Sequence, residues 1–144
     1  MFNQREDLLA NRVLLVTGAG DGIGKEAAIS FAKHGGQIIL LGRTKEKLEK
    51  VYDQIRETGA KESAIINIDL KTLDEATSER LRETIESKYG KIDVLLNNAA
   101  VLGARVPLEN YDSREWESVI QTNITSVFFL TKALLPLLKK STDG

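Results

Sequence analysis

The chain has 144 residues and is close to electrically neutral, with 20 Lys and Arg against 21 Asp and Glu and a formal net charge of -1. Its 42% hydrophobic and 28% charged residues are typical of one globular domain, residues 1–144, and exclude whole-chain disorder as well as the basic surface of a nucleic-acid-binding protein. There is no Cys and only one His, so metal centres built from Cys or from His clusters are excluded.

Four short apolar runs predict four β-strands. In chain order they cover residues 13–16, 37–41, 64–68 and 93–96. Each run is almost continuously apolar, which is typical of strands that are covered on both faces of a parallel sheet.

Longer amphipathic segments alternate with these runs and predict helices. They cover residues 22–33, 45–57, 73–88 and 113–139. Gly35, Gly59 and Gly90 stand just past the first three, where a C-terminal cap takes a positive φ. Asp112, with Glu115 three residues later, indicates the start of the last helix. The alternation predicts a Rossmann-like, doubly wound α/β fold that ends after the fourth strand and its following helix.

Nothing in the sequence indicates export or a membrane span. The first twelve residues are polar and lack the apolar core of a secretory signal. The longest apolar stretch, residues 127–138, is shorter than the roughly 20 residues that cross a bilayer. We therefore expect a cytoplasmic protein that binds neither membrane nor nucleic acid.

A glycine-rich turn, TGAGDGIG at residues 17–24, joins the first predicted strand to the first helix. Glycines let the backbone approach a ligand at a helix N-terminus, where free amides and the helix dipole favour a pyrophosphate. The alternative is a tight turn without a ligand. A P-loop is excluded because it needs Gly at Ala19 and Ser or Thr at Glu26, and a strict GxGxxG fingerprint would place its third Gly at Ile23. The candidate cofactor-binding residues here are Gly18, Gly20, Asp21, Gly22, Ile23 and Gly24.

The end of the second predicted strand indicates which dinucleotide binds. A site for NAD places Asp or Glu there, about 20 residues past the glycine turn, to bind the ribose hydroxyls. This sequence has Arg43 instead, whose guanidinium can pair with a 2'-phosphate, and Lys45 adds positive charge nearby. The sequence therefore predicts NADP(H) in preference to NAD(H), and the alternative is an exposed Arg without a ligand.

Four segments together resemble the short-chain dehydrogenase/reductase family over residues 9–140. Residues 17–24 resemble its TGxxxGxG motif, and residues 97–100 resemble its NNAG motif, with Ala100 in place of the usual Gly. Asp69 and Leu70 resemble the pair that contacts adenine, and Asn123 stands at the position of the catalytic Asn. The resemblance adds Asp69, Leu70, Asn97 and Ala99 to the cofactor site and gives Asn123 a catalytic role.

The resemblance implies an NADP(H)-dependent oxidoreductase that interconverts a carbonyl and an alcohol of a small molecule. It also implies a homo-oligomer formed through the last helix. The sequence indicates neither the substrate nor the direction of the reaction.

The family's proton-transfer group is missing from these 144 residues. It consists of a Tyr with a Lys four residues later and a Ser on a fifth strand, whereas the residues four positions after Tyr52, Tyr89 and Tyr111 are not Lys. We therefore expect negligible turnover from these residues alone. Two hypotheses stay open: the chain is the N-terminal, cofactor-binding part of such an oxidoreductase, or it is a complete, non-catalytic nucleotide-binding or interaction module.

Overall fold

The computed structural model describes residues 7–142, and its centre is a sheet of four parallel strands. The strands are β1 (Val13–Thr17), β2 (Gln37–Gly42), β3 (Ala64–Asn67) and β4 (Val94–Leu96). They lie in the order β3-β2-β1-β4, so the chain reverses its direction of winding after β3. This topology confirms the predicted Rossmann-like α/β fold.

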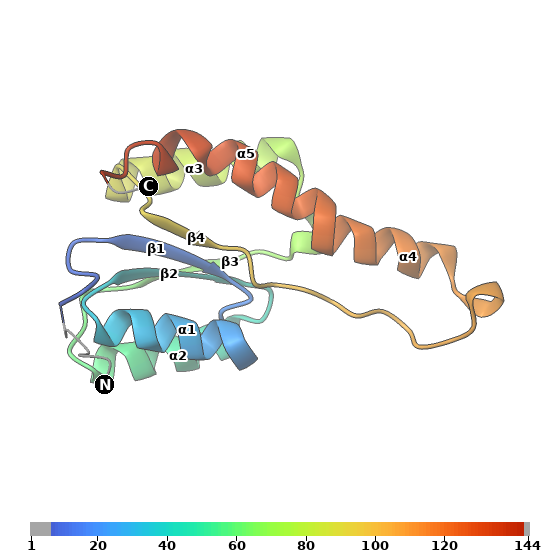
Figure 1. The fold of residues 1–144 in the computed structure, drawn as a ribbon, viewed down its shortest axis with the longest axis horizontal. Helices are drawn as coiled ribbons and strands as arrows, with labels where there is room; N and C mark the ends of the chain where they lie inside the picture. The colour runs from blue at the N-terminus through green and yellow to red at the C-terminus, as the bar shows by residue number, and fades with distance from the viewer. Residues whose placement is uncertain (1–6, 143–144) are drawn as a thin grey trace.

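Helices cover both faces of the sheet (Figure 1). They are α1 (Gly22–Lys33), α2 (Lys45–Glu57), α3 (Glu75–Tyr89), α4 (Ser113–Ile120) and α5 (Ser126–Leu138), with short turns η1 (Leu70–Thr72) and η2 (Leu108–Asn110). α1 and α2 lie on one face, and α3 and α5 lie on the other. α4 extends beyond the sheet beside the long segment that follows β4.

The hydrophobic core is divided into two layers by the sheet. Alternate residues of a strand point to opposite faces, so Leu15 of β1 packs on the α3 and α5 side while Leu14 packs on the α1 and α2 side. Leu134 of α5 and Leu48 of α2 are fully buried in their respective layers. Burial on both faces explains why the strands are continuously apolar in the sequence.

Aspartates begin three of the helices. Asp21 accepts a hydrogen bond from the Gly22 amide, Asp74 from the Thr77 amide and Asp112 from the Arg114 amide, at 2.8, 2.7 and 2.7 Å. α1 and α2 have the predicted bounds, whereas α3 begins at Glu75 rather than residue 73 because Asp74 caps it. The three glycines predicted to follow helices all have positive φ.

β4 begins one residue later than predicted, because Asp93 binds across to β1 instead of continuing the strand. Its Oδ2 accepts a hydrogen bond from the Val13 amide at 2.8 Å, and its Oδ1 accepts from Arg12, Lys91 and Ser141 at 3.2, 2.9 and 2.8 Å. The carboxylate side chain is only 2% exposed. Asp93 therefore joins the start of β1, the start of β4 and the end of the last helix.

The last helix is not regular, which corrects the prediction of a single α-helix over residues 113–139. A π-helical turn, η3 (Gln121–Thr125), separates α4 from α5. The side chain of Asn123 in this turn bonds to the backbone of Val101, and Gln121 donates to the carbonyl of Leu73 at 2.9 Å. A widened turn of this kind is common where a helix serves a functional site.

Together α4, η3 and α5 form a 26-residue helix, 113–138, in which an 18-residue window reaches a mean hydropathy of 1.2. By length and composition alone it could cross a membrane, so the apolar helical stretch is longer than residues 127–138 indicated. Its inner side chains Leu130, Leu134 and Leu137 are buried against α3 and the sheet. The core helix of a water-soluble protein passes the same test, so this is weak evidence for a membrane span.

Candidate functional site

A cavity of about 560 Å³ lies at the carboxyl ends of the four strands. Each strand contributes the segment that follows it, and the last helix adds Ser118 and Thr122. This is the crevice in which open parallel sheets bind ligands, next to the point where the winding reverses. Its volume lies in the range typical of sites for small molecules and cofactors.

The glycine-rich turn packs so closely against the turn after β4 that two positions have no room for a side chain. Gly18 has a φ of +64°, and a Cβ there would lie 2.9 Å from the Cα of Ala99. A Cβ on Gly24 would overlap the carbonyl oxygen of Gly18 and the side-chain nitrogen of Asn98. The first turn of α1 is therefore held against the strand ends, and its amides lie at the edge of the cavity.

Thr17 links the start of the glycine-rich turn to the turn after β4 through hydrogen bonds. Its buried hydroxyl accepts hydrogen bonds from the amides of Asn98 and Ala99, both at 3.0 Å, and donates to the carbonyl of Leu96 at 3.3 Å. The Asn98 side chain returns a bond to the carbonyl of Thr17 at 3.1 Å. These contacts fix one wall of the cavity and give Thr17 and Asn98 structural roles in it.

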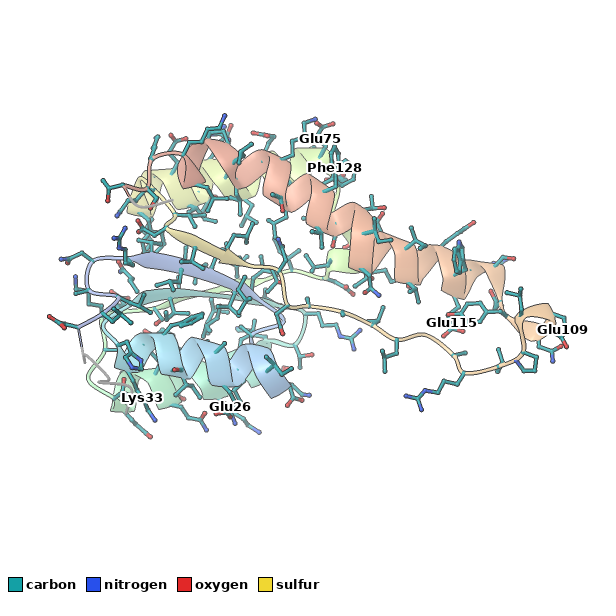
Figure 2. The ribbon with its side chains drawn as sticks, in the orientation of Figure 1. Glu26, Lys33, Glu75, Glu109, Glu115 and Phe128 are labelled. Carbon is teal, nitrogen blue, oxygen red and sulfur yellow. The ribbon has the colours of Figure 1, made fainter. Side chains whose placement is uncertain are left out.

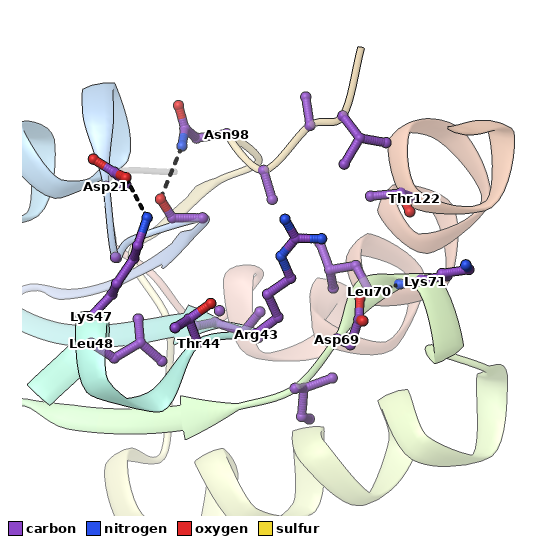
Figure 3. Close-up of a pocket in the computed structure, with 18 of the residues that line it drawn as sticks. Asp21, Arg43, Thr44, Lys47, Leu48, Asp69, Leu70, Lys71, Asn98 and Thr122 are labelled. Carbon is purple, nitrogen blue, oxygen red and sulfur yellow. Dashed lines mark hydrogen bonds and ion pairs between the residues drawn. The ribbon is translucent and has the colours of Figure 1, made fainter. Parts of the chain in front are cut away.

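The charged groups of the cavity include Arg43, Lys47 and Asp21 (Figure 3). Figure 3 shows the Arg43 side chain extending into the pocket, and within the described part of the chain no residue pairs with its guanidinium. Lys47 instead reaches the Asp21 carboxylate at 2.6 Å. This bond, then the Gly22 amide, lowers the pKa of Asp21 below its usual value. Lys45, expected near the site, is absent from the cavity lining. Its ammonium lies 3.6 Å from the carboxylate of Glu49 in the next turn of α2.

Asp69 and Leu70 line the cavity from the turn after β3. The Asp69 side chain accepts a hydrogen bond from the Lys71 amide at 2.9 Å and so begins η1. Leu70 is buried, which fixes the position of this turn against the core.

Asn123 is outside the cavity lining but adjacent to it. Its Nδ2 donates to the carbonyl of Val101 at 2.7 Å, and its Oδ1 accepts from the Val101 amide at 2.9 Å. Val101 and Thr122, the residue beside Asn123, both line the cavity. The side chain thus holds the segment after β4 in place.

The structure brings most of the predicted cofactor residues together. Those that line the cavity are Gly18, Gly20, Asp21, Gly22, Arg43, Asp69, Leu70 and Ala99. Gly24 lies behind the turn, Ile23 is 80% exposed beside it, and Asn97 donates to Thr131 of α5 at 3.3 Å. The sequence analysis missed Thr44, Lys47 and Lys71 on the cavity wall, and the only signal for them was their place just after β2 and β3.

The family model for short chain dehydrogenases matches residues 12–144. The chain belongs to the short-chain dehydrogenase family. The predicted membership is therefore confirmed, and the family acts on small molecules.

Several known proteins are similar to this chain. The uncharacterized oxidoreductase YciK of Escherichia coli is 41% identical over 143 residues, which cover 99% of this chain and 57% of that protein. A short-chain dehydrogenase from Shigella flexneri, solved with NADP, is 42% identical with a TM-score of 0.92 and is matched over 95% of this chain and 57% of its own. One from Escherichia coli CFT073, solved with NADPH, is 43% identical with a TM-score of 0.91 over the same shares. The chain thus spans just over half the length of these relatives.

Proposed function

We propose that this chain is the dinucleotide-binding part of an NADP(H)-dependent oxidoreductase that interconverts a carbonyl and an alcohol. When bound, the nicotinamide would supply the hydride transfer. The residues of the chain would bind and orient the dinucleotide. The chain spans just over half the length of these relatives. The oxidoreductase activity is therefore proposed for the whole protein of which these residues are a part.

The cavity walls fit the parts of a dinucleotide. Gly18, Gly20 and Gly22 leave the backbone open to a pyrophosphate at the first turn of α1. Asp69 and Leu70 stand where the family resemblance places the adenine. Ala99, in the turn after β4 that packs against Gly18, would also border the cofactor.

The observation that carries the proposal is Arg43. It stands at the end of β2, where an NAD-selective site has a carboxylate, and it extends into the cavity without a partner among residues 7–142. A free guanidinium would bind a 2'-phosphate through paired hydrogen bonds. The two similar proteins that were solved with NADP and NADPH also support this choice of cofactor.

The test is a titration of the full-length protein with NADPH and with NADH. We expect NADPH to bind more tightly than NADH. We expect Arg43→Gln to lower the affinity for NADPH by about tenfold or more and to leave the affinity for NADH nearly unchanged. Arg56→Gln, on the exposed side of α2, is the matched control and should change neither affinity. Equal affinities for the two dinucleotides would contradict the proposal.

We also propose that Asn123, for which the resemblance implies a catalytic role, acts as a positioning residue. Both polar atoms of its side chain bond the backbone of Val101, which fixes the orientation of the side-chain amide. This supports a role in fixing the segment that borders the cavity.

We further propose a cytoplasmic homo-oligomer that binds neither membrane nor nucleic acid. The outer side of the last helix supports self-association, because Trp116, Ile124 and Phe128 are 58%, 59% and 59% exposed. Figure 2 shows Phe128 on the side of α5 that faces away from the sheet. Large exposed apolar side chains that follow one helix are typical of an interface.

A further inference from the structure

Two cations on the cavity wall differ in how they are held. Arg43 at the end of β2 has no partner among the described residues, whereas Lys47 in the first turn of α2 is bonded to Asp21 at 2.6 Å. Asp21 belongs to the glycine-rich turn, 26 residues earlier in the chain. The bond therefore links the phosphate-binding turn to the helix that follows Arg43.

Both ends of this bond are fixed in position. One oxygen of Asp21 accepts the Gly22 amide at 2.8 Å, and the other accepts the Lys47 ammonium. The stem of Lys47 lies against the turn, because a Cβ added at Gly20 would lie 3.0 Å from the Cβ of Lys47. The ammonium is thus placed at the edge of the same cavity that Arg43 enters.

The charge of Asp21 is unfavourable for binding an anionic dinucleotide unless it is compensated. A carboxylate in a turn that faces a pyrophosphate repels it, and the bonded Lys47 cancels that charge. An ammonium has three N–H donors, and Asp21 uses one of them, so others remain for a phosphate oxygen.

A purely structural role does not account for the pair. The side chains of Lys47 and Asp21 are 53% and 73% exposed, and ion pairs this exposed contribute little to stability. A phosphate oxygen that displaces water from the ammonium would form a strong, charge-assisted hydrogen bond with it.

We propose that Lys47 is a second phosphate-binding cation of this cavity, placed by Asp21, and that it favours the dinucleotide with a phosphorylated ribose. The inference rests on the proposed NADP(H) function and adds Lys47 and Asp21 as determinants of cofactor specificity.

The test compares variants of the full-length protein in titrations with NADPH and NADH. Lys47→Gln should lower the ratio of the NADPH affinity to the NADH affinity by about tenfold. Lys50→Gln, also on α2 but outside the cavity lining, is the matched control and should leave the ratio unchanged. The melting temperatures of both variants should stay close to that of the unmodified protein, because the pair is exposed.

A second variant tests the role of Asp21. In the Lys47→Gln background, Asp21→Asn removes the uncompensated carboxylate and should recover part of the lost NADPH affinity. No recovery would overturn the claim that Lys47 compensates the charge of Asp21, and an unchanged ratio in Lys47→Gln would overturn the inference. If the unmodified protein does not prefer NADPH, the proposed function itself fails; if it does, and the preference depends on Arg43 but not on Lys47, only this inference fails.

Discussion

Asn123 and Val101 are 22 residues apart in the chain, yet the side chain of one bonds both backbone groups of the other, at 2.7 and 2.9 Å. The pair joins the π-helical turn of the last helix to the segment that leaves β4. Through this pair, the helix that carries Thr122 and the loop that carries Val101 form one wall of the cavity.

Asn123→Ala should loosen that wall. The backbone groups of Val101 would lose their partners, so we expect a loss of about 1–3 kcal/mol in the free energy of unfolding. The amide of Val101 should also exchange its hydrogen faster, which hydrogen–deuterium exchange measures directly. Gln54→Ala on the exposed side of α2 is the control. Unchanged exchange at Val101 would show that the two bonds do not hold the segment.

Gly24→Ala should disturb both the fold and the cofactor site. The added methyl would overlap the Gly18 carbonyl and crowd the side chain of Asn98, so the glycine-rich turn and the turn after β4 would have to move apart. Overpacking of this kind costs about 1–3 kcal/mol. We expect a lower melting temperature and weaker NADPH binding in a titration, whereas Ser30→Ala, on the exposed side of the same helix, should change neither. NADPH binding at full strength would contradict the close packing of this turn.

Asp93 should make the stability of the protein depend on acid pH. Burial alone would raise its pKa, but hydrogen bonds from the Val13 amide, Lys91, Ser141 and Arg12 lower the pKa from 3.8 to about 2. Because the folded-state value is the lower one, the ionised carboxylate stabilises the fold above the ordinary pKa. That stabilisation, about 2 kcal/mol, is lost as the pH falls from about 4 toward 2.

The variant Asp93→Asn isolates this contribution. Chemical unfolding between pH 2 and pH 7 should show a loss of about 2 kcal/mol at neutral pH and a smaller change in stability between pH 4 and pH 2. Asp53→Asn, at an exposed position on α2, should retain the full acid dependence. An acid dependence of equal size in Asp93→Asn would assign the effect to other carboxylates.

Phe128→Glu should weaken self-association. A charge placed on the exposed apolar side of α5 would be desolvated in an interface, so we expect the oligomer to dissociate at concentrations where the unmodified protein stays assembled. Light scattering coupled to size-exclusion chromatography measures the mass. Leu8→Glu, at a side chain that is 65% exposed far from this helix, is the control. A monomeric unmodified protein would contradict the proposed oligomer.

The sequence predicted the parts of the fold that depend on local patterns. α1 and α2 have the predicted bounds because both lie between apolar strands and turns with clear start and stop residues. The widened turn at Asn123 could not be predicted, because it depends on a partner, Val101, that only the folded chain brings near. The start of β4 was missed for the same reason, since Asp93 bonds to Val13, 80 residues away.

In the candidate site too, local sequence patterns predicted some residues, whereas others depend on partners that are distant in the chain. The glycine-rich turn and Arg43 could be recognised from spacing, because their positions after β1 and β2 are set by the strands themselves. Sequence alone could not distinguish Asn97 from Asn98, since only the fold shows that Asn98 bonds to Thr17 while Asn97 turns toward Thr131. The pairing of Lys47 with Asp21 likewise depends on how α2 packs beside the turn.

The central claim is that this cavity selects a dinucleotide with a phosphorylated ribose. Calorimetric titration of the full-length protein with 2',5'-ADP and with 5'-AMP tests it most directly, because the two ligands differ only in the 2'-phosphate. We predict that 2',5'-ADP binds at least about tenfold more tightly and that added salt reduces the difference. Equal affinities for the two nucleotides would contradict the account.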